Sequence, residues 1–342
     1  IKTCMSNSHQ PVALTWLSGP DIDRLAMTND EIIAAVEQGL VAQGTPKGAV
    51  IEPRMHLTPD PAFNGHFNVL RGYVAPLELA GVKIVGDYVD KYKKGLPSEM
   101  ALLNLFDPQT GMPRAILDAT LITDARTGAL TAIGAKHLAR KNSKILGHVG
   151  ARGTAYWNVR LLDHLYDFDE IRVHSRRPES REAFAARLEA DLGKKIKVTD
   201  NWRECLEDAD IMVEASRLAE REELFKADWV KPGTCVIPYG TVSALDIQMT
   251  DIMDKVVIDD VGQFRAGKLG ALRPHIDAGL LSEDTVHSEL CQIIIGAKPA
   301  REREDETILF WHRGLSLSDI ALGAAMLKKA EKLGIGQQLV YR

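Results

Sequence analysis

Hydrophobic and polar positions follow two patterns along the 342-residue chain, and the change lies near residue 144. Before it, Thr28–Ala42 has apolar residues at helical spacing and predicts an amphipathic helix. A longer helix is predicted over Thr123–Arg140, with Thr123 or Asp124 at its start. Around these helices the pattern predicts clustered strands over Val12–Leu17, Val50–Leu57, His66–Val74, Gly81–Asp87, Ala101–Asp107 and Pro113–Leu117. This first part is therefore predicted to be α+β.

After residue 144, short apolar runs alternate with helical patterns. Strands are predicted over Lys144–Val149, Glu170–Ser175, Lys195–Val198, Asp210–Ala215, Thr234–Pro238 and Lys255–Asp259. Helices are predicted over Thr154–Tyr166, Ser180–Leu192, Trp202–Asp208 and near Ser282–Ile295. This alternation predicts an α/β fold with a parallel, doubly wound sheet. A last apolar helix, Leu315–Leu333, is expected to return and pack on the first part.

The turn after Lys144–Val149 carries a nucleotide-binding motif. A strand, a turn of small residues and a helix begin a βαβ unit in which N–H groups at the helix N-terminus face a pyrophosphate. Arg152 replaces the middle glycine of the G-x-G-x-x-G pattern, so its side chain must turn away from the phosphates or lie along them. The alternative is a turn that binds nothing. The candidate cofactor contacts are Gly150, Ala151, Arg152, Gly153 and Thr154, with Ser216 and Gly240 after two later strands.

The second strand of this unit ends at Ser175, followed by Arg176 and Arg177, where an NAD-binding unit usually has an acid. Such an acid accepts hydrogen bonds from the ribose hydroxyls and repels a 2′-phosphate. A hydroxyl and two guanidiniums instead suit a phosphate dianion. These residues favour NADP over NAD, and use of both stays open. The alternative is a pair of solvated surface arginines.

Three basic residues of the first part are candidates for holding an anion. Lys83 lies inside an apolar strand, where a buried ammonium without a partner is costly. Arg126 falls among small residues in the first turns of a helix, and Arg54 lies at the start of a strand. For each one taken alone, a salt bridge to a carboxylate such as Asp87 or Asp118 is the simpler interpretation.

Composition narrows the class of protein. The formal net charge of −5 gives no electrostatic case for nucleic acid or an anionic membrane. No apolar run approaches the roughly 18 residues that a membrane span needs. Cys4, Cys205, Cys235 and Cys291 are far apart, which predicts thiols in a reducing cytoplasm rather than disulfides or a zinc site. The histidines show no metal spacing, so no metal is predicted.

Several segments resemble the ornithine cyclodeaminase/μ-crystallin family, and the resemblance covers nearly the whole chain. The order and spacing of the segments make it specific; they are Gly81–Lys83, Gly95–Ser98, Leu105–Gly111, Leu121–Ala132, Asp305–Phe310 and Gly314–Ala321. The resemblance implies a Rossmann-type doubly wound sheet, residues 129–310, inserted into an α+β substrate-binding and dimerisation domain, residues 1–128 and 311–342. It also implies a homodimer.

The same resemblance implies NAD(P)-dependent chemistry at a carbon that bears an amino or imino group beside a carboxylate. Position by position, Arg54, Lys83 and Arg126 match the residues that grip the substrate carboxylate in that family. Three cations around one carboxylate would fix the α-carbon against the nicotinamide. The predicted function is therefore an imine reductase or amino-acid dehydrogenase that uses NADP or NAD. An ornithine- or lysine-type cyclodeaminase with bound NAD, and a non-catalytic NADP-dependent binding protein, stay open.

The chain departs from the family pattern at Arg152, where the family usually has glycine. Family cyclodeaminases also carry an acid shortly after the glycine that matches Gly240, and Val242 or Ser243 falls there in this chain. That departure argues against ring-closing ammonia elimination. Arg71 lies in a third altered stretch and is a candidate second anion contact, for example for a dicarboxylic substrate, with a structural salt bridge as the equal alternative.

Overall fold

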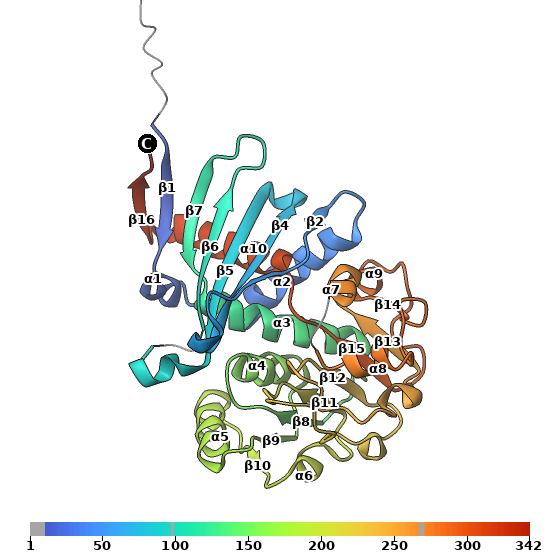
Figure 1. Ribbon diagram of the computed structural model, residues 1–342. Helices are drawn as coiled ribbons and strands as arrows, with labels where there is room; N and C mark the ends of the chain where they lie inside the picture. The colour runs from blue at the N-terminus through green and yellow to red at the C-terminus, as the bar shows by residue number, and fades with distance from the viewer. Residues whose placement is uncertain (1–10, 97–98, 267–269) are drawn as a thin grey trace, which may run out of the picture.

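The computed structural model describes residues 11–96, 99–266 and 270–342; Cys4, Pro97 and Ser98 lie outside these ranges. Its first sheet, in the upper part of Figure 1, has the order β16-β1-β7-β6-β5-β4-β2, and β3 pairs with β4. Neighbouring strands are antiparallel apart from β1 and β7. The strands are β1 (Ala13–Leu17), β2 (Ala49–Ile51), β3 (Met55–Leu57), β4 (Gly65–Val74), β5 (Leu79–Tyr88), β6 (Glu99–Phe106), β7 (Pro113–Asp118) and β16 (Gln337–Val340).

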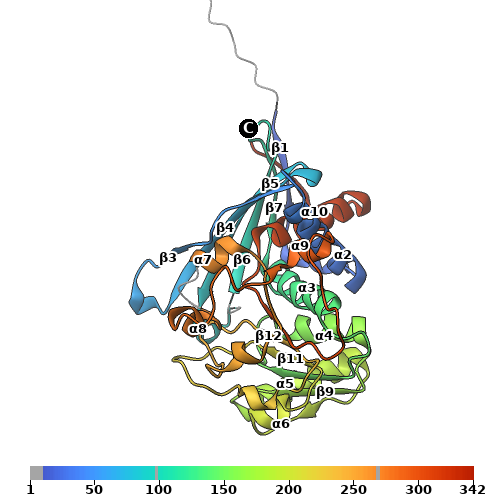
Figure 2. The same cartoon turned by 90° about the vertical axis from the view of Figure 1, so that its right-hand side faces the viewer.

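Helices cover one face of the first sheet, as Figures 1 and 2 show from two sides. These are α2 (Asn29–Gly44), α3 (Thr120–Leu138) and α10 (Ser316–Leu333), with the short α1 (Gly19–Arg24) beside β7. Helix α2 begins at a capping box, in which the Thr28 hydroxyl accepts from the Glu31 amide and the Glu31 carboxylate accepts from the Thr28 amide. Its apolar stripe is buried at Ile32, Ile33, Val36 and Leu40, as the periodicity predicted.

The second sheet is parallel throughout, with the order β10-β9-β8-β11-β12-β15-β13-β14. Its strands are β8 (Ile145–Val149), β9 (Glu170–His174), β10 (Lys197–Val198), β11 (Ile211–Glu214), β12 (Cys235–Pro238), β13 (Lys255–Ile258), β14 (Ser288–Glu289) and β15 (Ile308–Trp311). The helices that connect them are α4 (Ala155–Tyr166), α5 (Pro178–Leu192), α6 (Trp202–Leu206), α7 (Val261–Ala266), α8 (Arg273–Asp277) and α9 (Leu290–Ile294). The predicted Rossmann-type sheet is confirmed.

Helix α3 joins the two halves because it packs closely on the second sheet and its helices. A Cβ added at Gly128 would lie 2.5 Å from Trp157 of α4, and one at Gly134 would lie 2.3 Å from the ring of Phe310 in β15. One hydrophobic core therefore runs from α2 and α10 through α3 to β8 and β9. The N-terminal half of α3 is thereby held where the two halves meet.

Several predicted boundaries were wrong. Helix α3 begins at Thr120, about one turn before the predicted start, and its N-cap Ala119 makes no side-chain capping bond that a sequence pattern could reveal. The helix expected near Ser282–Ile295 is confined to Leu290–Ile294. The strand expected over Val50–Leu57 is divided into β2 and β3.

The described residues offer neither a membrane-spanning helix nor a cluster of metal ligands. None of their helices combines the length and hydropathy that a membrane span requires. Nor do these residues bring together three His, Cys, Asp or Glu side chains that could hold a metal ion. Cys205, Cys235 and Cys291 are buried free thiols.

Candidate active site between the two sheets

A cavity of about 680 Å³ lies between the first sheet and the carboxyl ends of the second. In open α/β sheets, ligands bind at the carboxyl ends of the strands where the strand order reverses. Here that place is between β8 and β11. Polar side chains reach the cavity from the first sheet and α3, including Arg54, His56, Asp87, Glu99 and Arg126. From the second sheet come Arg152, Thr154, Ser216, Arg217, Tyr239 and Arg313.

The glycine turn after β8 fits a dinucleotide phosphate. Gly150 has φ 112°, and a Cβ there would lie 2.7 Å from the Ala215 carbonyl oxygen, so glycine lets β8 approach the loop after β11. Gly153 has φ 55°, and the nearest atom to an added Cβ is a carboxylate oxygen of Asp124 at 3.8 Å. Gly153 and Thr154 line the cavity immediately before α4. The amides of the first turn of α4 are thus placed as phosphate binding requires.

Arg152 also lines the cavity and is exposed. Among residues 11–96, 99–266 and 270–342 its guanidinium has no hydrogen-bond or ion-pair partner. The sequence left open whether this side chain turns away from the phosphates or lies along them. Because Arg152 lines the cavity without a partner, it is free to lie along a phosphate. Ala151 belongs to the same turn and packs against the hydrophobic core instead.

Ser216 and Gly240 meet at the buried carboxylate of Glu214. One oxygen of Glu214 accepts from the Ser216 amide at 2.8 Å and from its hydroxyl at 2.5 Å, and the other accepts from the Gly240 amide at 3.2 Å. A Cβ added at Gly240 would lie 2.6 Å from both carboxylate oxygens. Burial raises the pKa of Glu214. These bonds hold the ends of β11 and β12 together beside the cavity.

Ser175, Arg176 and Arg177 follow β9 on the same carboxyl edge of the sheet, outside the wall of the cavity. Arg176 lies 3.7 Å from Glu222, and both side chains are exposed. Arg177 is exposed and, in the described part of the chain, its guanidinium has no ion-pair partner. The three residues are accessible to a group that extends along the sheet from the glycine turn.

The three candidate cations converge on one carboxylate, Asp319 of α10. Its Oδ1 lies 2.5 Å from Lys83 Nζ and 2.9 Å from Arg126 Nε. Arg54 lies next to this pair and donates to the carbonyl oxygens of Arg313 at 2.7 Å and Gly314 at 3.3 Å. The simpler interpretation, separate salt bridges to Asp87 or Asp118, was therefore wrong about the partner.

Burial changes the acidity of these groups. It lowers the pKa of Lys83 to about 7, although Asp319 opposes the shift, and it lowers the pKa of Arg54 to about 9. Arg54 and Arg126 line the cavity, whereas Lys83 is fully buried behind its wall. Arg126 Nη1 has no hydrogen-bond partner among the described residues, and it lies so close to Gly314 that no larger residue fits there. A buried guanidinium with a free donor is arranged to receive an anion.

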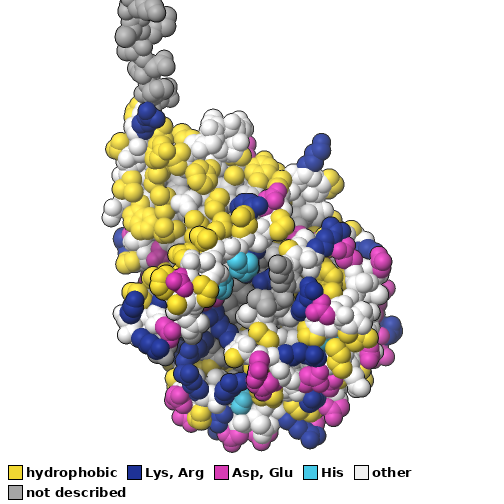
Figure 3. All heavy atoms as spheres, viewed as in Figure 1, with side chains coloured by type: hydrophobic (Ala, Val, Ile, Leu, Met, Phe, Trp, Pro, Cys, Tyr) yellow, Lys and Arg dark blue, Asp and Glu magenta, His cyan; other side chains and the backbone are white. Residues whose placement is uncertain are grey.

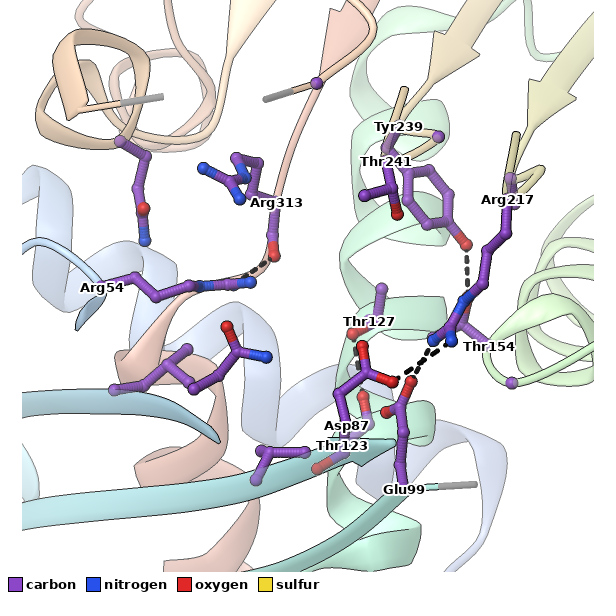
Figure 4. Close-up of a pocket in the computed structure, with 18 of the residues that line it drawn as sticks. Arg54, Asp87, Glu99, Thr123, Thr127, Thr154, Arg217, Tyr239, Thr241 and Arg313 are labelled. Atoms are coloured by element: carbon purple, nitrogen blue, oxygen red, sulfur yellow. Dashed lines mark hydrogen bonds and ion pairs between the residues drawn. The ribbon is translucent and has the colours of Figure 1, made fainter. Parts of the chain in front are cut away.

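The opposite wall carries its own ion pairs, drawn in Figure 4. Arg217, after β11, lies 3.3 Å from Asp87 of β5 and 2.5 Å from Glu99 of β6. These bonds connect the two sheets across the cavity. Tyr239 lies beside them, with its hydroxyl 2.6 Å from the Thr154 hydroxyl.

The sequence matches the ornithine cyclodeaminase/mu-crystallin family over residues 17–332. The chain belongs to this family. Alanine dehydrogenase of Archaeoglobus fulgidus is 28% identical over 317 residues, which cover 91% of this chain and 94% of the relative.

Solved structures of this family have the same fold. Delta(1)-pyrroline-2-carboxylate reductase of Thermococcus litoralis, in complex with NADH and L-proline, is 29% identical with a TM-score of 0.88, covering 95% of this chain and 100% of that one. An archaeal alanine dehydrogenase dimer with bound NAD is 27% identical with a TM-score of 0.87, covering 97% and 100% of the two chains.

The departures from the family pattern can now be placed. After Gly240 the wall of the cavity continues with Thr241, whereas Ser243 is not part of the wall and its hydroxyl donates to the Ala271 carbonyl at 2.6 Å. Arg71 lies 3.5 Å from Glu52 and is not part of the wall, so the structural salt bridge is the correct alternative.

Sequence reasoning missed Asp319, Arg217 and Arg313. Asp319 had a usable signal, since it is the one acid in the mostly apolar stretch Leu317–Leu327 of α10 and is buried with its neighbours Ser318 and Ile320. Arg217 had none, because its partners on β5 and β6 are 118 to 130 residues away in the chain.

Proposed function

We propose that the protein is an NAD(P)-dependent oxidoreductase that acts on the C–N bond of an α-amino or α-imino acid. The observation that carries this proposal is the placement of Arg126 and Arg54 in the wall of a cavity whose other side is a phosphate-binding turn. Related enzymes of the family support it: one is an alanine dehydrogenase, and another is a pyrroline-carboxylate reductase solved with NADH and L-proline.

Some residues would bind the substrate carboxylate, and others would hold those residues in place. A bound nicotinamide nucleotide would supply or accept the hydride. Arg126 and Arg54 hold the substrate carboxylate by charge-assisted hydrogen bonds, which fixes the position of the α-carbon. Lys83 and Asp319 lie behind Arg126 and orient it. An ordered water supplies the proton that the imine nitrogen takes up, because Lys83 is buried behind the wall of the cavity and donates to Asp319.

The cofactor site consists of Gly150, Arg152, Gly153 and Thr154, with Ala151 supporting the turn, Ser216 and Gly240 beside it, and Ser175, Arg176 and Arg177 at the adenosine end. The accessible Arg177 favours a 2′-phosphate and hence NADP, with NAD as the alternative cofactor.

A cyclodeaminase is the weaker alternative. That reaction needs an acid free to transfer protons near the substrate nitrogen. The carboxylates found in the described wall of the cavity are Asp87 and Glu99, and Arg217 pairs with both. Simple hydride transfer needs no such acid.

We also propose a homodimer in the cytoplasm. The face of the first sheet that α2, α3 and α10 do not cover carries exposed apolar side chains, among them Ile84, Met100 and Leu102. Figure 3 shows hydrophobic side chains gathered over the upper part of the molecule, where the first sheet lies. A family member was solved as a dimer. The buried free thiols suit a reducing compartment.

Residues 1–128 and 311–342 would form the substrate-binding and dimerisation domain around a dinucleotide-binding domain of residues 129–310, with α3 continuous across the first boundary.

A spectrophotometric screen tests the proposal. The protein is assayed with 2-oxo acids plus ammonia or methylamine, and with cyclic imines, using NADPH and NADH in parallel. Loss of the reduced-nicotinamide absorbance with at least one substrate is expected. No change across the whole panel would refute an oxidoreductase and favour a binding protein. Ammonia release from ornithine or lysine without net change in the nucleotide would select the cyclodeaminase.

A further inference from the structure

Arg313 is a cation of the cavity wall that the proposed chemistry leaves unused. It follows β15 and its side chain is partly buried. Its amide donates to the buried carboxylate of Asp259 at 2.8 Å, but its guanidinium has no ion-pair or hydrogen-bond partner among the described residues. Figure 4 shows it on the same side of the pocket as Arg54, away from Asp87, Glu99 and Arg217. A desolvated guanidinium without a partner is expensive unless an anion comes to it.

The charges around Arg313 do not balance without a ligand. Arg54, Arg126 and Arg313 bring three guanidiniums to this side of the cavity, and Arg313 contributes to the lowered pKa of Arg54. Asp319 pairs with Arg126, and Asp259 acts on Arg313, but burial raises the pKa of Asp259 to about 7, so that it is only partly charged near neutral pH. One substrate carboxylate on Arg126 and Arg54 therefore leaves the positive charge at Arg313 only partly balanced.

Arg313 lies beside Arg54 and Arg126, the two arginines proposed to hold the substrate carboxylate. The segment Arg313–Gly314 connects them: Arg126 Nη1 packs against Gly314, and Arg54 donates to both carbonyls of the segment. The guanidiniums of Arg54, Arg126 and Arg313 line one cavity, and Arg313 is the charge that most lowers the pKa of Arg54, so the anion considered is a short dicarboxylic acid.

We infer that Arg313 binds a second carboxylate, so that the substrate is a dicarboxylic 2-imino or 2-amino acid. This inference rests on the proposed function and names its substrate class. The reaction adds a hydride from the reduced nucleotide to C2 and a proton to nitrogen, and the distal carboxylate is unchanged. Arg71, which sequence reasoning considered for this task, is paired with Glu52 outside the cavity.

Paired substrates of equal length test the inference. The ratio of kcat/KM for 2-oxoglutarate to that for 2-oxopentanoate, each with ammonia and NADPH or NADH, isolates the distal carboxylate. The same ratio is measured for oxaloacetate and 2-oxobutyrate. Charge-assisted hydrogen bonds predict that the diacid exceeds its partner by about 10- to 100-fold in the native protein. In Arg313→Gln the ratio should fall toward one, and in Arg313→Lys it should recover in part. Arg203→Gln, at an exposed arginine of α6, is the matched control and should keep the native ratio.

The possible outcomes distinguish a failure of this inference from a failure of the proposed function. Activity with a monocarboxylic acid or a cyclic imine equal to or above that with the diacids would overturn the inference and leave the oxidoreductase intact. A preference for ornithine or lysine would also overturn it, and would point to Asp87 and Glu99 as the recognising groups. So would an Arg313→Gln protein whose KM for the nucleotide rises while the substrate ratio is unchanged. Inactivity with every compound would refute the proposed function instead.

Discussion

Replacing Asp319 by Asn tests how the cationic cluster is held in place. Asp319 is fully buried, with its Oδ1 2.5 Å from Lys83 Nζ and 2.9 Å from Arg126 Nε. Asparagine keeps the shape of the side chain and removes its charge. Breaking a buried ion pair from one side costs about 3–5 kcal/mol, against a total of about 5–15 kcal/mol for a folded domain. We therefore expect Asp319→Asn to unfold at a much lower urea concentration.

The loss should depend on pH through Lys83. Burial already lowers the pKa of Lys83 to about 7 with Asp319 present, and without that carboxylate the ammonium loses its proton at still lower pH. Well above pH 7, Lys83 is neutral in both folded proteins, and Arg126 alone carries the cost because its guanidinium stays charged. Below pH 7 the cost of the charged lysine is added. The loss of stability is thus larger in mildly acidic buffer than in mildly alkaline buffer.

Urea unfolding followed by tryptophan fluorescence measures both effects. Asp305→Asn is the control, since Asp305 is exposed and pairs with the exposed Arg303. Its loss should be below about 1 kcal/mol. An Asp319→Asn protein as stable as this control in both buffers would show that the cluster needs no internal carboxylate, and the reasoning would fail.

Three further variants test other parts of the account. Lys83→Ala should abolish turnover while dinucleotide binding, followed by fluorescence titration, survives; full activity would exclude its role. Arg177→Gln should lower the ratio of kcat/KM for NADPH to that for NADH by about tenfold, since a charged hydrogen bond to phosphate is lost, whereas Arg203→Gln should not. Burial raises the pKa of Asp259 from 3.8 to about 7, so the contribution of Asp259 to stability falls as pH rises through this window. Asp259→Asn should flatten that fall, and an unchanged pH profile of unfolding would count against it.

Much of the fold follows from local patterns, because its elements bury regular apolar faces. The alternation after residue 144 predicted the parallel sheet, and the strands predicted over Ala101–Asp107 and Pro113–Leu117 are present as the antiparallel pair β6 and β7. Strand β16 was missed because its four exposed residues, two polar followed by two apolar, do not alternate as a strand pattern would. The strand is formed by pairing with β1. Such an edge strand is defined by its distant neighbour and carries little signal of its own.

The candidate site was predictable in its parts and less so in their arrangement. Lys83 and the glycine turn stood out because a buried ammonium and a positive φ each impose a local demand. The partners of the cations are far along the chain. Asp319 is 236 residues from Lys83, and Arg313, whose carbonyl accepts from Arg54, is 259 residues from it. Periodicity contains no information on which of many carboxylates closes such a pair.

A crystal structure of the ternary complex, with the reduced nucleotide and the amino acid that is the product of the best substrate in the screen, tests the central claim most directly. The account predicts the α-carboxylate on the guanidiniums of Arg126 and Arg54, with C2 against the nicotinamide and the diphosphate on the turn at Gly150–Thr154. An amino acid bound with its carboxylate away from both arginines, or a nucleotide seated elsewhere than on that turn, would contradict it.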